Sequence, residues 1–188
     1  KVHRQSLVRA FLMIIIMESR ITGKCGQCAQ TMFTKSGRQR KFRLSRGFIC
    51  CLIILRIMDQ CAVATSTQKS SAQKSLHRIG AWDYLSGVVY GDEVEHGKPE
   101  PDIFLRAAGF IGCEPSECVV IEDSINGIKA GHAAGMKVIH IPDTIEINDD
   151  IRSLTSVVCH SLSDVPDIID TWNEGKVVDI EAIMKMPR

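Results

Sequence analysis

The feature that most constrains the fold is a regular alternation of short apolar runs and helix-patterned segments, which begins near residue 59. Apolar runs that end in polar residues, as buried strands do, occupy residues 61–67, 86–93, 117–123, 136–143 and 157–165. Segments with helical spacing of apolar residues lie between or after them, at residues 68–80, 98–112, 124–135 and 166–175. Strands that alternate with helices indicate a parallel sheet covered on both faces. We therefore predict an α/β fold, a three-layer Rossmann-like parallel sheet.

The N-terminal third differs in charge and in pattern. Residues 1–58 hold 12 Lys and Arg but a single acid, Glu18, whereas the remainder holds 11 basic and 21 acidic residues. A basic, acid-poor arm is typical of nucleic-acid or anionic-membrane binding, or of a transit peptide. Here the basic residues alternate with apolar ones, and no aromatic stacking pattern accompanies them. A basic-arm nucleic-acid binder is therefore kept as an alternative function, with nucleic acid an unfavoured partner.

The cysteines and the lengths of the apolar runs indicate where in the cell the protein is located. The chain has eight Cys, and no signal peptide is visible, so we expect reduced thiols in a cytoplasmic protein. Cys25 and Cys28 have half of a zinc-site spacing, but no second spaced pair completes it, so we interpret them as incidental thiols. No apolar run approaches the ~20 residues that a membrane span needs, so we expect no membrane partner.

Polar residues that could bind a ligand or take part in a reaction follow the predicted strands at their carboxyl ends, where open parallel sheets bind ligands. Glu122 and Asp123 end one strand as adjacent carboxylates, which repel unless a cation or water separates them. Mg²⁺ takes carboxylates, waters and a phosphate oxygen, so the pair is a candidate metal site; the alternative is a solvated strand end before a capped helix. Thr65 and Ser66 offer a hydroxyl and an amide for a phosphate oxygen, although hydroxyls after a strand are common.

Lys98 lies in a Gly-Lys-Pro-Glu-Pro stretch that fixes the backbone just before a helix. A rigidly held ammonium is suited to neutralising a phosphoryl group and a nearby carboxylate. The alternative is a surface lysine in a turn. There is no G-x-S-x-G and no G-x-x-x-x-G-K-[ST], so neither a hydrolase elbow nor a nucleotide P-loop is supported.

Taken together, the stretches VATST, GDEVEHGKPEPDIFLRAA and CVVIEDSINGIKAGHAAGMKVIHIPD resemble the haloacid dehalogenase (HAD) superfamily, in its β-phosphoglucomutase-like phosphatase branch. The resemblance covers residues 59–172. It implies that Thr65 is the phosphate-binding hydroxyl, that Lys98 balances charge between phosphate and nucleophile, and that Glu122 and Asp123 hold Mg²⁺. The implied substrate is a small phosphorylated metabolite.

The chain departs from that family at its front half. Members begin with an apolar strand that ends in Asp-x-Asp-Gly, whose first Asp attacks phosphorus and whose second is the acid/base; a helical cap follows. This chain has no Asp before Asp59 and no D-x-D-G. One stretch, residues 11–23, is a candidate replacement for the missing strand, because its apolar run is followed by an acid, Glu18. Glu18 would then replace the nucleophilic Asp, although a Glu side chain is one methylene longer. Arg20, two residues on, cannot act as the second carboxylate. We expect residues 1–58 to be an atypical basic segment, a degenerate cap remnant.

These observations predict a HAD-like core over residues 59–175, incomplete at its N-terminal side, and a C-terminal tail over residues 176–188. The expected function is that of a phosphohydrolase or phosphomutase-type domain with Mg²⁺-assisted aspartyl-phosphate chemistry, inactive or impaired because the nucleophilic Asp is missing. The alternatives are a non-catalytic phosphate- and metal-binding or protein-interaction module, and the nucleic-acid binder described above. No sequence pattern indicates an oligomeric state.

Overall fold

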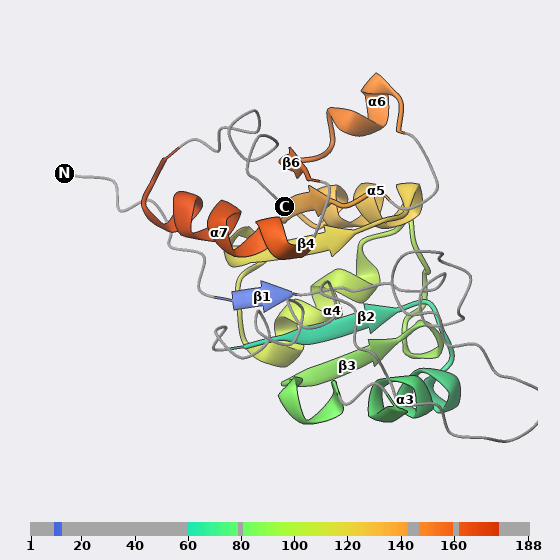
Figure 1. Ribbon diagram of the computed structural model, residues 1–188. Coiled ribbons are helices and arrows are strands. Elements are labelled where there is room, and N and C mark those ends of the chain that lie inside the picture. The colour runs from blue at the N-terminus through green and yellow to red at the C-terminus, as the bar shows by residue number, and fades with distance from the viewer. Residues whose placement is uncertain (1–9, 13–59, 79–80, 143–146, 160–161, 177–188) are drawn as a thin grey trace, which may run out of the picture.

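The computed structural model of the protein describes residues 10–12, 60–78, 81–142, 147–159 and 162–176. In that part of the chain six parallel strands lie side by side (Figure 1). Four pair in the order β1-β4-β5-β6 and two in the order β2-β3. Their bounds are β1 Ala10–Leu12, β2 Ala62–Thr65, β3 Gly87–Tyr90, β4 Cys118–Glu122, β5 Lys137–His140 and β6 Val157–Val158.

Strand β1 joins the two groups. Its residue Ala10 is in register with Cys118 of β4, and on its other side β1 contacts β2, so that it lies between them in Figure 1. Every pairing is parallel, and Figure 1 shows β1 and β2 pointing the same way, so β2, which ends at Thr65, and β4, which ends at Glu122, end at one edge. The predicted parallel α/β sheet is therefore confirmed.

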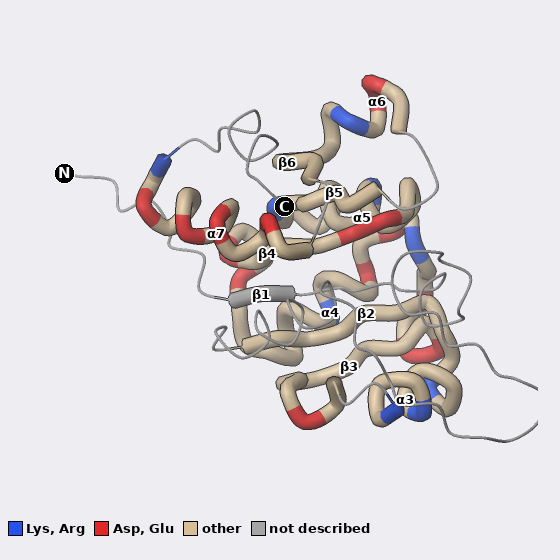
Figure 2. Tube along the Cα trace, viewed as in Figure 1, with Lys and Arg blue, Asp and Glu red and all other residues tan. Residues whose placement is uncertain are grey.

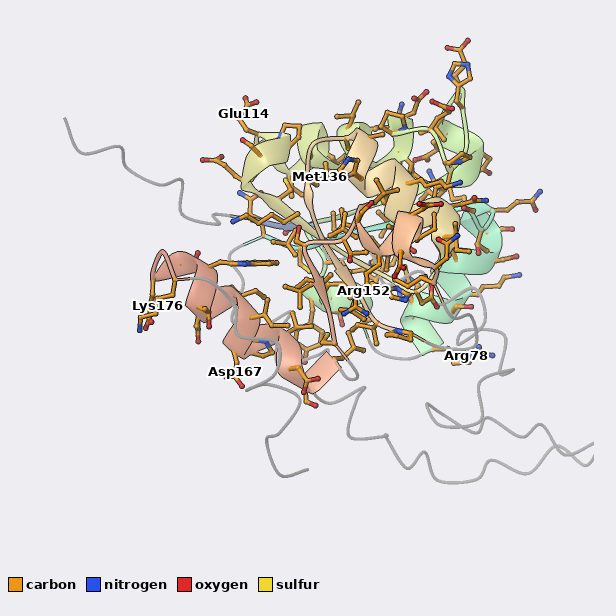
Figure 3. The ribbon with its side chains drawn as sticks, turned by 90° about the horizontal axis from the view of Figure 1, so that it is seen from above. Arg78, Glu114, Met136, Arg152, Asp167 and Lys176 are labelled. Carbon is orange, nitrogen blue, oxygen red and sulfur yellow. The ribbon has the colours of Figure 1, made fainter. Side chains whose placement is uncertain are left out.

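Helices cover both faces, as a three-layer arrangement requires. On one face α4 (Asp102–Ile111), α5 (Ile125–Ala133) and α6 (Asp149–Arg152) pack on alternate strand residues, among them Val120 and Val138. On the other face α7 (Val165–Asn173) packs over β4, β5 and β6, and α3 (Lys69–Arg78) over β2 and β3. Figure 3 shows the side chains that fill the space between these layers.

Local signals in the sequence account for where the helices begin and end. α4 follows Pro101 and ends at Gly112, whose φ of 70° is the left-handed conformation that glycine adopts at little cost. The strands and helices predicted from residue 61 onward are confirmed, with shorter bounds. The four-residue helix α6 was not predicted, because residues 149–152 hold one buried apolar side chain, Ile151, which is too few to produce a period.

Charge is unevenly distributed over the helices. Lys and Arg mark α3, and Asp and Glu mark α7 (Figure 2). Figure 3 shows Asp167 near the start of α7 and Lys176 beyond its end. Within the described ranges no helix is both long enough and apolar enough to cross a bilayer. The proposed segment 1–58 lies outside the described residues except for β1, and the tail 176–188 lies outside them except for Lys176.

Candidate active site

The carboxyl edge of the sheet holds a buried ion pair. The Nζ atom of Lys98 lies 2.8 Å from Oε1 of Glu122, and the two side chains are 4% and 0% exposed. Lys98 also lies over the ring of Phe104 on α4, with Nζ 4.7 Å from the ring centroid. Burial removes water from both charges, so each depends on the other for compensation. Lys98, one of the predicted site residues, therefore lies in direct contact with Glu122, a predicted metal ligand.

The second oxygen of Glu122 is held by the residue that starts α5. Oε2 accepts hydrogen bonds from the hydroxyl of Ser124 at 2.9 Å and from its backbone N–H at 3.2 Å. The same hydroxyl oxygen accepts from the N–H of Gly127 at 3.0 Å, which makes Ser124 the N-cap of the helix. One side chain therefore ties the helix start to the carboxylate.

Gly127 explains how a carboxylate fits beneath the first turn of α5. A Cβ atom at this position would overlap the carboxyl group of Glu122. A small first turn such as Asn126-Gly127 could leave space for an approaching ligand. The structure fills the space at Gly127 with Glu122 instead, because the buried side chain needs room between β4 and α5.

The backbone of Glu122 is also fixed. Its carbonyl oxygen accepts from the N–H of Ile141 at 2.9 Å and lies 3.1 Å from Nδ1 of His140. His140 is fully buried, and its Nε2 has no hydrogen-bond partner in the described part of the chain. Burial lowers the pKa of His140, and the hydrogen bond to the carbonyl opposes this lowering. Sequence reasoning missed this residue; its position within a strand pattern, at residues 136–143, was the available signal.

Thr65 and Ser66 lie at the end of β2. Thr65 is buried, and its hydroxyl oxygen accepts from the N–H of Thr67 at 3.1 Å, which closes a turn at the strand end. Ser66 is exposed, and its backbone lies so close to Gly91 that a Cβ there would overlap it. The structure thus brings Lys98 and Glu122 together, and it has Thr65 and Ser66 on the same edge, beyond β1 from β4.

The side chains at the end of β4 are of a type that binds a hard divalent ion. Glu122 and Asp123 are adjacent carboxylates at the strand end, and carboxylate oxygens are the ligands that Mg²⁺ prefers. Asp123 is partly exposed, and it has at least one interaction of its own. Glu122 has both oxygens engaged, by Lys98 and by Ser124. Among the described residues, no group of three or more His, Cys, Asp or Glu could hold a metal. Glu18 and Arg20 lie outside the described residues.

Comparison with known proteins agrees with the resemblance. The family model described as haloacid dehalogenase-like hydrolase matches residues 25–141, well over half of the chain. Fructose-1-phosphate phosphatase YqaB of Escherichia coli is 41% identical over 80 residues, which cover 43% of this chain and 43% of that protein. The bifunctional riboflavin kinase/FMN phosphatase of Arabidopsis thaliana is 37% identical over 105 residues, 55% of this chain and 27% of that protein.

The fold has solved counterparts. CbbY of Rhodobacter sphaeroides, in complex with phosphate, superposes with a TM-score of 0.55 at 29% identity, covering 65% of this chain and 56% of that one. The chain spans less than half the length of the curated relatives it matches.

Proposed function

Because the chain belongs to the haloacid dehalogenase-like hydrolase family, we propose that it carries the phosphate- and metal-facing half of a phosphohydrolase or phosphomutase-type site. The observation that carries this proposal is the buried pair of Lys98 and Glu122 at the carboxyl edge of the sheet. A buried charge pair is a weak source of stability compared with apolar packing, so its presence at this edge favours a role in binding.

The substrate class that we propose is a small phosphorylated metabolite. Relatives named for fructose-1-phosphate and for FMN support this class, and the residues at the edge are suited to a phosphate group. Lys98 would supply positive charge, and Thr65 and Ser66 would donate a hydroxyl and an amide to phosphate oxygens. The start of α5, a nine-residue helix, would add the positive end of its dipole.

We propose that Asp123 and Glu122 hold Mg²⁺, with Asp123 as the more accessible ligand. When bound, the ion would neutralise charge on the phosphoryl group and stabilise its transfer. Lys98 would compete with the ion for Glu122, since it already occupies Oε1. Ser124 would keep the second oxygen oriented, because its hydroxyl and its amide both donate to it.

We expect this chain to turn over phosphoesters poorly or not at all. The sequence has no Asp before Asp59 and no Asp-x-Asp, the pair that forms the aspartyl-phosphate and moves the proton in this family. Covalent transfer depends on placing the nucleophile within a fraction of an ångström, so a Glu at position 18 is a poor replacement.

The test is phosphate release from an aryl phosphate by the 188-residue chain, with and without Mg²⁺, beside Glu18→Gln and Lys98→Met. No release by any of these proteins is the expected result. Mg²⁺-dependent release that Lys98→Met abolishes and Glu18→Gln leaves intact would contradict the predicted impairment. Release abolished by Glu18→Gln would instead identify Glu18 as the nucleophile.

A second candidate function is a module that binds phosphate and metal without turnover. The lack of an Asp-x-Asp pair in the sequence favours it, because binding of phosphate by Lys98, Thr65 and Ser66 needs no nucleophile. Calorimetric titration with Mg²⁺ and with inorganic phosphate separates the two ideas. Binding without release of phosphate supports the module, and no binding at all contradicts both.

Two further predictions concern nucleic-acid binding and the cellular location. Nucleic-acid binding by residues 1–58 would weaken steeply with salt and vanish when the segment is deleted. We propose a cytoplasmic location because Cys113 and Cys118 are thiols, as expected in a reducing compartment.

A further inference from the structure

A groove runs along the outer side of β3, on the side away from β2. Its floor is β3 together with Ser86 just before it, and its volume is about 450 Å³. Trp82 and Leu85 line one wall, on the α3 side of the sheet. Arg106 and Phe110 of α4 line the other.

The floor of this groove is an unpaired sheet edge. Within the described ranges, β3 has a neighbouring strand on one side only, where Val88 and Val89 are in register with Val63 and Ala64 of β2. Alternate backbone N–H and C=O groups of an edge strand point away from its neighbour and can pair with another strand. The walls combine apolar side chains (Trp82, Leu85 and Phe110) with charged ones (Lys69, Glu93 and Arg106). A groove with a strand edge as its floor is shaped to receive an extended segment.

Phe110 is the feature that makes this edge unusual. Its side chain is 62% exposed, the most exposed large apolar side chain in the described part of the chain. The ring lies against Gly87, where any Cβ would overlap it. A large aromatic ring held over the end of an open strand edge is a mark of an interaction surface.

The pair formed by Phe110 and Arg106 indicates what binds there. The two residues are four apart on α4, so they lie one turn apart on the same wall. The end of α4 lies over the start of β3, since Phe110 touches Gly87, so the helix runs antiparallel to the strand. If two copies join their β3 strands antiparallel, their α4 helices also run antiparallel.

We propose that a second copy of this chain occupies the groove, with the two β3 strands paired antiparallel across a two-fold axis. Such an interface is self-complementary, so each contact occurs twice. The antiparallel helices then bring Phe110 of each copy to Arg106 of the other, an attraction between a guanidinium and an aromatic ring. An unrelated extended peptide would also satisfy the strand edge, but it would bring no second α4 helix to meet Arg106 and Phe110.

The experiment is sedimentation equilibrium of the full chain over a range of concentrations. The unmodified chain is expected to dimerise. Arg106→Glu places a carboxylate against Phe110, and Phe110→Lys places two cations together, so each is expected to weaken the dimer by about tenfold or more. The double variant pairs Glu with Lys twice and is expected to restore the dimer. Arg152→Glu, on α6 near the opposite sheet edge (Figures 1 and 3), is the matched charge control.

Each other outcome overturns the proposal. A chain that stays monomeric at every concentration shows that no second copy occupies the groove, even if an added peptide binds there. A dimer that tolerates both single changes uses another surface. Single variants that dissociate without rescue in the double variant show that Arg106 and Phe110 do not meet across the axis. Circular dichroism of each variant checks that the fold is retained.

Discussion

The ammonium nitrogen of Lys98 lies 2.8 Å from Oε1 of Glu122, and neither side chain is more than 4% exposed. Lys98→Met leaves the Glu122 carboxylate charged and buried, so we expect a loss of about 3–5 kcal/mol in the free energy of unfolding. Urea denaturation measures it.

The double variant Lys98→Met/Glu122→Gln removes the charge from both sites and should recover most of that loss. Lys69→Met is the surface control, because Lys69 pairs with Glu93 at 3.0 Å with side chains 53% and 26% exposed. Its effect should be far smaller, since water already solvates that pair. Equal losses for Lys98→Met and Lys69→Met would show that the Lys98–Glu122 pair is not buried.

Gly127→Ala tests how the Glu122 carboxylate is accommodated. The added methyl group overlaps that carboxyl group, which must move away from Ser124 and Lys98. We expect a loss of about 1–3 kcal/mol in unfolding free energy, measured by thermal or urea unfolding. Gly109→Ala is the control: nothing lies within 4 Å of its Cβ, and an alanine in the exposed face of α4 should stabilise by about 0.8–1 kcal/mol. A stabilising Gly127→Ala would contradict the observed packing.

His140 should make stability depend on pH. Burial lowers its pKa in the folded protein below the ordinary value of 6.5, so the unfolded chain binds a proton more readily. The contribution of His140 to stability is complete above pH ~6.5. As the pH falls below that value stability declines, until the lowered pKa of the folded state is reached. We therefore expect the urea concentration at the unfolding midpoint, measured in the presence of a chelator, to fall less between pH 8 and pH 5 for His140→Leu than for the unmodified chain.

The matched change is His132→Leu, at an exposed position on α5. This variant should keep the pH dependence of the unmodified chain. If His132→Leu flattens the profile and His140→Leu does not, burial of His140 is not the cause.

Cys118 should be protected from alkylation. It is buried at the start of β4, and its thiol lies 3.3 Å from the carbonyl oxygen of Glu114. Burial, with smaller contributions from neighbouring acidic groups, raises its pKa to about 12. Because the thiolate is the reactive form, labelling by iodoacetamide at pH 8 should occur only when the chain unfolds. Peptide mass spectrometry across a urea series measures it, and rapid labelling in native buffer would contradict it.

Much of the sheet could be predicted from sequence, because the spacing of the apolar residues and the residues that start and end each element indicate the same boundaries there. The apolar run before Glu122, the cap at Ser124 and the glycine after α4 each act locally, so they can be recognised one at a time. Which residues meet depends on strand order, which no local pattern carries. Lys98 and Glu122 were both singled out, yet their direct contact, and the place of Gly127 beneath it, depend on α4 and α5 packing on one face.

Two features of the structure have no distinctive signal in the sequence. His140 and the β3 edge were missed because a histidine in a strand and a phenylalanine on a helix look ordinary. His140 is distinguished only by its unpartnered nitrogen, and Phe110 only by its exposure over Gly87.

The position of β1 has a consequence for how the protein is made. Ala10 and Cys118 are in register, although roughly a hundred residues separate them along the chain. β2 pairs with β3, and β4 with β5, over far shorter separations. Contacts between distant residues close large loops and form slowly. During synthesis, residues 10–12 cannot pair with β4 until residues 118–120 have left the ribosome, so β2 and β3 can pair before β1 does.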